Sequence, residues 1–129
     1  MIEVPVSWGE LVDKITILQI KSDRMRDEAK LANVRKELTL LSEKLGENAS
    51  NADVVRLTAE LYSVNTALWE IEDDIRECEN VGDFSEKFVG LARSVYITND
   101  KRSELKREIN AVLGSALIEE KSYQAYKIQ

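Results

Sequence analysis

Apolar residues recur every third or fourth position over most of the chain, which is the spacing of one face of an α-helix. This spacing predicts helices over residues 8–45, 52–79 and 84–113, followed by a short helix or tail over 116–126. A slip in the pattern near Ala29 predicts a stutter or a bend within the first helix. The second helix keeps the spacing without error at Val54, Leu57, Leu61, Val64, Leu68, Ile71, Ile75 and Cys78.

Capping signals mark two of the predicted helix starts. Ser7, with Glu10 three residues later, has the spacing of a capping box, in which a side-chain oxygen accepts a bond from the first turn of the helix. Asp83 and Glu86 have the same spacing at the start of the third helix. Gly9 lies in the first turn, where uncovered backbone N–H groups can also hold an anion.

Long regular helices joined by short loops predict an all-α fold: one domain over 1–129, an antiparallel, coiled-coil-like three-helix bundle with a long first helix. At about 1.5 Å per residue, the first helix overhangs the second by about 15 Å. Trp8, Leu11, Val12 and Ile15 then lie beyond the hairpin as apolar surface. Either the helix bends, the C-terminal tail covers this surface, or a second chain does. We expect a homo-oligomer, with a dimer favoured, or another protein partner.

Composition and net charge argue against several classes of partner and of catalytic chemistry. The 129 residues are 43% hydrophobic and 33% charged, with a net charge of −6. Such an acidic chain repels phosphate backbones, so we expect no nucleic-acid partner. The absence of histidine argues against zinc chemistry and against Ser-His or Cys-His catalysis. A single cysteine, no apolar run long enough for a membrane span and no signal-peptide pattern predict a cytoplasmic protein.

Polar residues interrupt the apolar stripes at one level of the predicted bundle. Pairing the helices about their loops brings Asn33, Asn65 and Asn99 to one height, with Arg102 one turn away. The favoured interpretation is a buried polar layer that fixes helix register. The alternative is a small polar pocket, for which the candidate ligand-binding residues are Asn65, Trp69, Arg93, Tyr96, Asn99 and Arg102.

Two pairs of acids have the spacing that places both carboxylates on one helix face: Glu10 with Asp13, and Glu70 with Asp73. All-α nucleotide pyrophosphatases hold magnesium with acids spaced in this way, and oxygen ligands suit that ion. The spacing is common in any acidic helix, so a solvated face with no cofactor is the favoured interpretation. The predicted pairing also places Asp73 near Arg24 rather than near Asp13, which counts against a four-acid magnesium site.

Four stretches of the chain resemble an uncharacterised family of small helical bacterial and phage proteins. They include a VPVSxGELxDKITIL opening and an ARSVYxxNDxR motif, and they read VPVSWGELVDKITILQIK, LWEIEDDIR, LARSVYITNDKRSELKREIN and LGSALIEEKSY. The resemblance implies a helical protein of unknown function, sometimes found in the company of cell-surface glycan genes. It implies no catalytic residues. A fainter similarity, in LWEIEDDIR and NDKRSELKREIN, is to another helical family of unknown function.

The sequence is compatible with three functional hypotheses. Regular heptads, the overhang, and the lack of histidine and of a phosphate loop favour a non-enzymatic helical interaction or accessory protein that associates with itself. The second is a magnesium-dependent enzyme acting on a phosphorylated small molecule or nucleotide, with the four acids as ligands and Arg93 or Arg102 binding phosphate. The third is a small-ligand module that uses Tyr96, Asn99 and Arg102 without catalysis.

Overall fold

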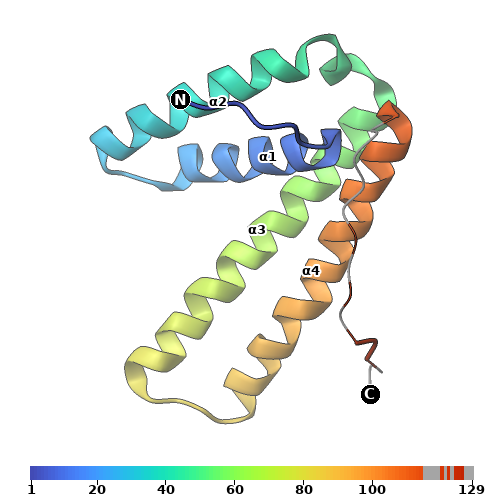
Figure 1. The fold of residues 1–129 in the computed structure, drawn as a ribbon. Coiled ribbons are helices and arrows are strands. Elements are labelled where there is room, and N and C mark those ends of the chain that lie inside the picture. Colours follow the sequence, from blue (N-terminus) through green and yellow to red (C-terminus); the bar gives the residue numbers. More distant parts are fainter. Residues whose placement is uncertain (115–119, 121, 123, 127–129) are drawn as a thin grey trace.

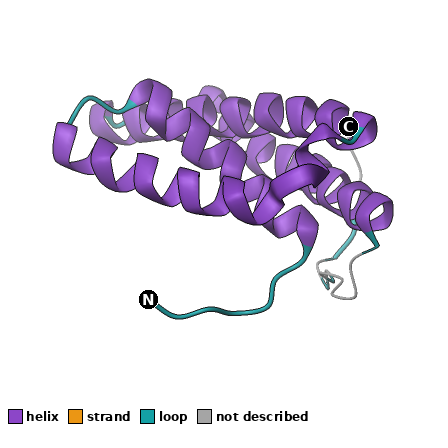
Figure 2. Ribbon diagram, turned by 90° about the horizontal axis from the view of Figure 1, so that it is seen from above, coloured by secondary structure: helices purple, strands orange, loops and turns teal. Residues whose placement is uncertain are grey.

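The computed structural model describes residues 1–114, 120, 122 and 124–126, and every regular element in this part of the chain is helical (Figure 2). The elements are α1 (Trp8–Arg24), α2 (Glu28–Leu45), the 3-10 helix η1 (Gly46–Ser50), α3 (Ala52–Val81) and α4 (Glu86–Leu113). The all-α prediction is therefore confirmed. The three-helix arrangement is not, because the described residues form four α-helices.

The predicted first helix over 8–45 is two helices, which corrects that prediction. Met25 leaves α1 with extended backbone, at φ −76° and ψ 146°. Asp27 then begins α2, because its Oδ1 accepts a hydrogen bond from the Lys30 N–H at 2.9 Å. An aspartate cap stabilises a new helix start. The slip in the apolar pattern near Ala29 thus marks a break followed by a reversal of the chain.

The break also removes the predicted overhang. Because the chain turns back at residues 25–27, α1 lies beside α2, and Leu11, Val12 and Ile15 become part of the central hydrophobic core (Figure 1). Trp8 packs against the same core. The overhang therefore gives no argument for a partner.

Two antiparallel hairpins, α1–α2 and α3–α4, meet at one end and diverge from there (Figure 1). The α1 helix lies across the first half of α3 and the last half of α4, and the core fills this crossing. Leu57, Leu61 and Val64 contribute from α3, and Leu105 and Ile109 from α4. We call the remaining parts of α3 and α4, beyond the crossing, the distal hairpin.

In the part of the chain that the structure describes, the distal hairpin consists of two helices with no third helix over them (Figure 1). Cys78 on this seam is buried. The other seam side chains continue the same heptad pattern but are only half-buried: Leu68, Ile71, Ile75, Phe88, Leu91 and Val95. Val81, Phe84 and Val89 beside them are more than half exposed, at 67%, 57% and 51%. The heptad spacing of apolar residues thus extends beyond the hydrophobic core of the described residues.

The helix ends follow their capping residues. Ser7 begins α1 as predicted, because its Oγ accepts from the Glu10 N–H at 3.1 Å. The predicted cap at Asp83 is wrong by two residues: Ser85 caps α4, and Asp83 Oδ1 accepts from the Ser85 N–H at 3.0 Å. Hydrogen bonds from Ser85 lower the pKa of Asp83.

The helix predicted over 116–126 lies largely outside the described residues. Those that are described there, 120, 122 and 124–126, have no regular secondary structure.

The backbones of α1 and α4 lie close together at Gly9. The Gly9 N–H donates to Asn110 Oδ1 at 2.7 Å, so this first-turn donor, considered above for an anion, has a protein partner. A Cβ built on Gly9 would lie 2.3 Å from the backbone oxygen of Lys106. Backbone cannot move aside as a flexible side chain can. Glycine at this position therefore lets the first turn of α1 touch α4.

Replacing Gly9 by Ala should destabilise the fold by about 1–3 kcal/mol, since the added methyl forces the two backbones apart. Gly90→Ala is the matched control, because a Cβ on that α4 residue meets nothing within 4 Å. The control should gain up to about 1 kcal/mol from better helix propensity. Urea unfolding measures both variants, and equal effects of the two substitutions would contradict the close approach.

Candidate functional site

A buried carboxylate lies where the two hairpins cross. Asp13, on α1, is 1% exposed, so its charge is almost wholly removed from water. Arg102, on α4, donates from Nε to Asp13 Oδ1 at 2.8 Å, and a second guanidinium nitrogen binds Asp13 Oδ2. This is the two-pronged geometry in which arginine binds carboxylates most strongly. The pair links α1 to α4.

A side-chain amide ties the same carboxylate to α3. Asn65 Nδ2 donates to Asp13 Oδ1 at 2.9 Å and lies 2.8 Å from Thr16 Oγ1. The Thr16 hydroxyl donates its own hydrogen to the backbone oxygen of Asp13 at 2.7 Å. Three helices therefore meet through one network, which we call the Asp13 cluster: Asp13, Thr16, Asn65 and Arg102.

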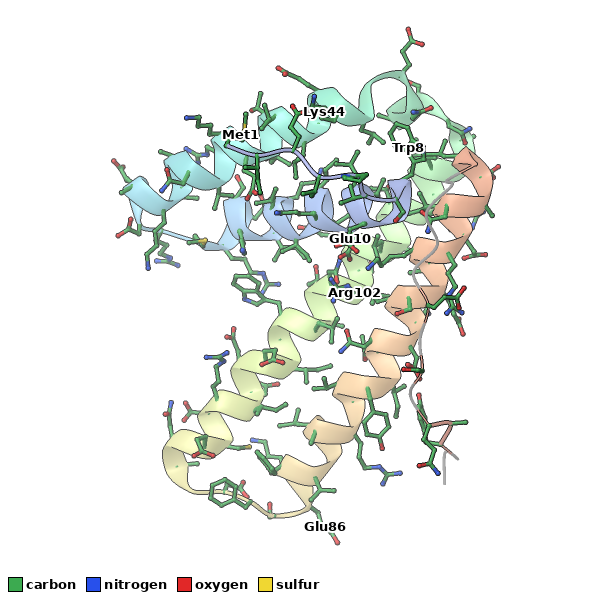
Figure 3. The ribbon with its side chains drawn as sticks, viewed as in Figure 1. Met1, Trp8, Glu10, Lys44, Glu86 and Arg102 are labelled. Atoms are coloured by element: carbon green, nitrogen blue, oxygen red, sulfur yellow. The ribbon has the colours of Figure 1, made fainter. Side chains whose placement is uncertain are left out.

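A second ion pair extends the network towards solvent. Lys106 Nζ lies 2.7 Å from Glu10 Oε2, with the Lys106 side chain 9% exposed and that of Glu10 42% exposed. Figure 3 shows Glu10 and Arg102 close together where α1 crosses α4. Arg102, Lys106 and Asn110 are spaced four residues apart and form one polar row along α4, facing α1.

The arrangement is well suited to joining helices. Both oxygens of Asp13 bind donors from other helices, and burial strengthens such bonds while making an unpaired charge costly. The cluster therefore fixes how α1 crosses α3 and α4. It differs from the polar layer that the sequence favoured: of Asn33, Asn65 and Asn99 only Asn65 belongs to it, and it is centred on Asp13. Asn33 lies exposed on α2, away from the layer.

The four acids considered for magnesium do not meet at one point. Glu10 pairs with Lys106 and Asp13 with Arg102, whereas Glu70 lies 3.0 Å from Arg24. Asp73 is exposed further along α3. No three acidic or thiol side chains gather as a metal-holding group within the described residues. The magnesium site stays a prediction, and these contacts do not favour it.

The six candidate ligand residues separate into two groups. Asn65 and Arg102 belong to the Asp13 cluster, whereas Trp69 is half-buried on α3 and Asn99 half-buried on α4. Arg93 is exposed on the distal hairpin. Tyr96 is 42% exposed, and its ring meets Tyr126 edge-on with centroids 4.8 Å apart.

A shallow depression lies elsewhere, on α2, lined by Arg35, Lys36, Thr39, Leu40 and Glu43.

Two tyrosines have a raised pKa because each hydroxyl bonds to a carboxylate. Tyr62, on α3, donates to Asp23 Oδ2 at 3.0 Å, and this bond is the main cause of its raised pKa. A hydrogen bond to Asp100 raises the pKa of Tyr126 in the same way. Tyr62 is half-buried and Tyr126 is exposed. The Tyr62 contact is a further link between α1 and α3 on the outer side of the crossing.

Sequence reasoning missed Thr16, Lys106 and Asn110, and it considered Asp13 only as a magnesium candidate or as part of a solvated face. A signal was present, because Asp13 and Thr16, together with Lys14 and Gln19, interrupt a largely apolar run between Leu11 and Ile20. The row of polar residues spaced by four on α4 was also visible. Neither pattern indicates its partner helix without the chain reversal at residues 25–27.

Removing the guanidinium should leave the buried Asp13 charge without its partner. Arg102→Met should therefore destabilise the protein by about 3–5 kcal/mol. The control Arg24→Met breaks the exposed pair with Glu70, for which we expect at most about 1 kcal/mol. Chemical unfolding measures both variants.

A double variant separates the charge from the packing. Asp13→Asn combined with Arg102→Met should be more stable than Arg102→Met alone, because no charge is then buried without a partner. Strictly additive losses in the double variant would contradict the assignment.

Comparison with known proteins adds a family but no activity. No curated protein and no solved structure matches the chain. None of the described helices has the length and apolarity that crossing a membrane requires. Residues 2–128 match the family model described as DUF6165, a family of unknown function. The chain therefore belongs to the DUF6165 family.

Proposed function

We propose that this protein is a non-enzymatic helical interaction protein that pairs with a second copy of itself. The observation that carries the proposal is the distal hairpin. Its seam continues the heptad pattern of the core, yet no third helix among the described residues covers it (Figure 1). Half-buried seams of this kind are completed by further helices in four-helix bundles. Exposed apolar patches are also a usual mark of interaction surfaces.

The ion pairs of the acidic residues also support an interaction function. Glu10, Asp13 and Glu70, which the enzyme hypothesis needs as ligands, each pair with a cation of another helix. Binding an ion at Asp13 would break its pair with Arg102 and so remove a contact that joins α1 to α4. The interaction function asks for no such rearrangement. A thermal-shift series with magnesium, manganese and nucleotides compares the two, because the interaction function predicts no shift.

We extend the proposal to a cytoplasmic location. Cys78, the single cysteine of the sequence, is buried and forms no disulfide. It occupies a seam position on α3, where a small apolar side chain fits. A buried thiol of this kind is compatible with a reducing compartment.

Sedimentation over a range of concentrations tests self-association directly. We expect a species of twice the 14.7 kDa chain mass at high concentration, with dissociation on dilution. Hydrogen exchange locates the contact: amides of residues 69–98 should gain protection as the protein is concentrated. Amides of residues 102–110, which already lie in the core crossing, provide the internal reference. A monomer at every concentration would contradict the proposed function.

A further inference from the structure

The two hairpins that diverge from the core carry opposite charge. Residues 21–36, at the end of the α1–α2 hairpin, hold six basic and three acidic side chains, and we call them the basic tip. Residues 69–81, on the distal part of α3, hold six acidic side chains and one basic, and we call them the acidic flank. The acids of the flank are Glu70, Glu72, Asp73, Asp74, Glu77 and Glu79.

Most of these charges have no ion-pair partner within the described part of the chain. One pair joins the two patches, Arg24 with Glu70 at 3.0 Å. The other exposed cations of the tip, Arg26, Lys30, Arg35 and Lys36, form no ion pair with a described residue. The same is true of the five later acids of the flank. Two patches of opposite sign on one chain are thus left largely unneutralised.

The geometry explains why the chain does not neutralise itself. The Arg24–Glu70 pair joins the last residue of α1 to the beginning of the acidic flank. Beyond Glu70, the distal hairpin leads away from the α1–α2 hairpin (Figure 1). Glu86, at the far end of the α3–α4 hairpin, lies well away from α1 and α2 (Figure 3). The tip of one chain therefore reaches only the beginning of its own flank.

Both patches also carry partly covered apolar side chains. In the acidic flank Trp69, Ile71 and Ile75 are half-buried, and in the basic tip Met25 and Leu31 are half-buried. Charge complementarity alone gives rate and orientation more than affinity. Apolar groups at the centre of the contact supply the area that a stable interface needs.

We propose that the basic tip of one chain docks on the acidic flank of a second copy, and that the second copy returns the same contact about a two-fold axis. This inference rests on the proposed self-association and names its surfaces. A second copy is the indicated occupant because both complementary patches belong to the same chain. One two-fold axis then forms two equivalent contacts and closes the assembly as a dimer.

Charge reversal tests the pairing. The tip variant is Arg26→Glu with Lys30→Glu, and the flank variant is Asp73→Lys with Glu77→Lys. All four side chains are exposed. The changes respect the helix dipoles, because acids near the start of α2 and bases near the end of α3 are favourable. The control, Glu104→Lys with Glu108→Lys, reverses two exposed acids of α4 that lie outside both patches.

The expected pattern is specific to reciprocal docking. Each patch variant alone should dimerise at least about tenfold more weakly than the unmodified chain, because like charges then face each other in both contacts. An equimolar mixture of the tip and flank variants should form a heterodimer, because both of its contacts are attractive again. The control should dimerise as the unmodified chain does, and added salt should weaken that dimer.

Sedimentation of the separate variants and of their mixture measures these outcomes, with circular dichroism verifying that each variant is folded. A dimer indifferent to both reversals, or a mixture that stays monomeric, overturns the docking and leaves the proposed function standing. An unmodified chain that is monomeric at every concentration overturns both.

Discussion

The structure depends on one buried charge. Asp13 lies in a crossing of three helices, where an ionised carboxylate is tolerated only because Arg102 and Asn65 bind it from two different helices. Apolar packing around Asp13 stabilises the contact between the helices but does little to fix their orientation. The hydrogen bonds fix that orientation, since a guanidinium and an amide bind the carboxylate at defined angles. The crossing of α1 over α3 and α4 is thus specified by polar contacts within an apolar core.

This crossing determines the surface that the molecule presents. Because α1 covers only the first half of α3 and the last half of α4, the distal hairpin extends beyond the core and its seam is half-covered (Figure 1). The same angle separates the basic tip from most of the acidic flank. The proposed self-association therefore depends on the angle between the hairpins, which keeps the basic tip and most of the acidic flank of one chain apart.

Much of the secondary structure follows from the sequence. The heptads predicted α3 to within two residues, and Ser7 correctly marked the start of α1. The break at residues 25–27 escaped prediction because Asp27 is both an acceptable helix residue on an acidic surface and a helix cap. Local spacing does not decide between these two roles. The choice depends on burying Leu11, Val12 and Ile15, which is a tertiary effect.

Some residues of the candidate site could be identified from the sequence, but the contacts between them could not. Pairing the helices about their loops identified Asn65 as a member of a polar layer, with Arg102 one turn away. Asp13 was considered only as a magnesium ligand or as part of a solvated face, since its true partner lies 89 residues away on a helix whose crossing was unknown. The close contact at Gly9 was not predictable from the sequence, because glycine is required at this position only once α4 packs against it.

The most direct measurement is the distance between the two hairpin ends. Spin labels at Ala29 and Val81, both exposed, in a Cys78→Ala background diluted with unlabelled protein, report the angle within one chain by pulsed electron resonance. The account predicts one narrow distance distribution that broadens when Arg102→Met is added. A distribution that is broad from the outset, or unchanged by Arg102→Met, would contradict the central role of the Asp13 cluster.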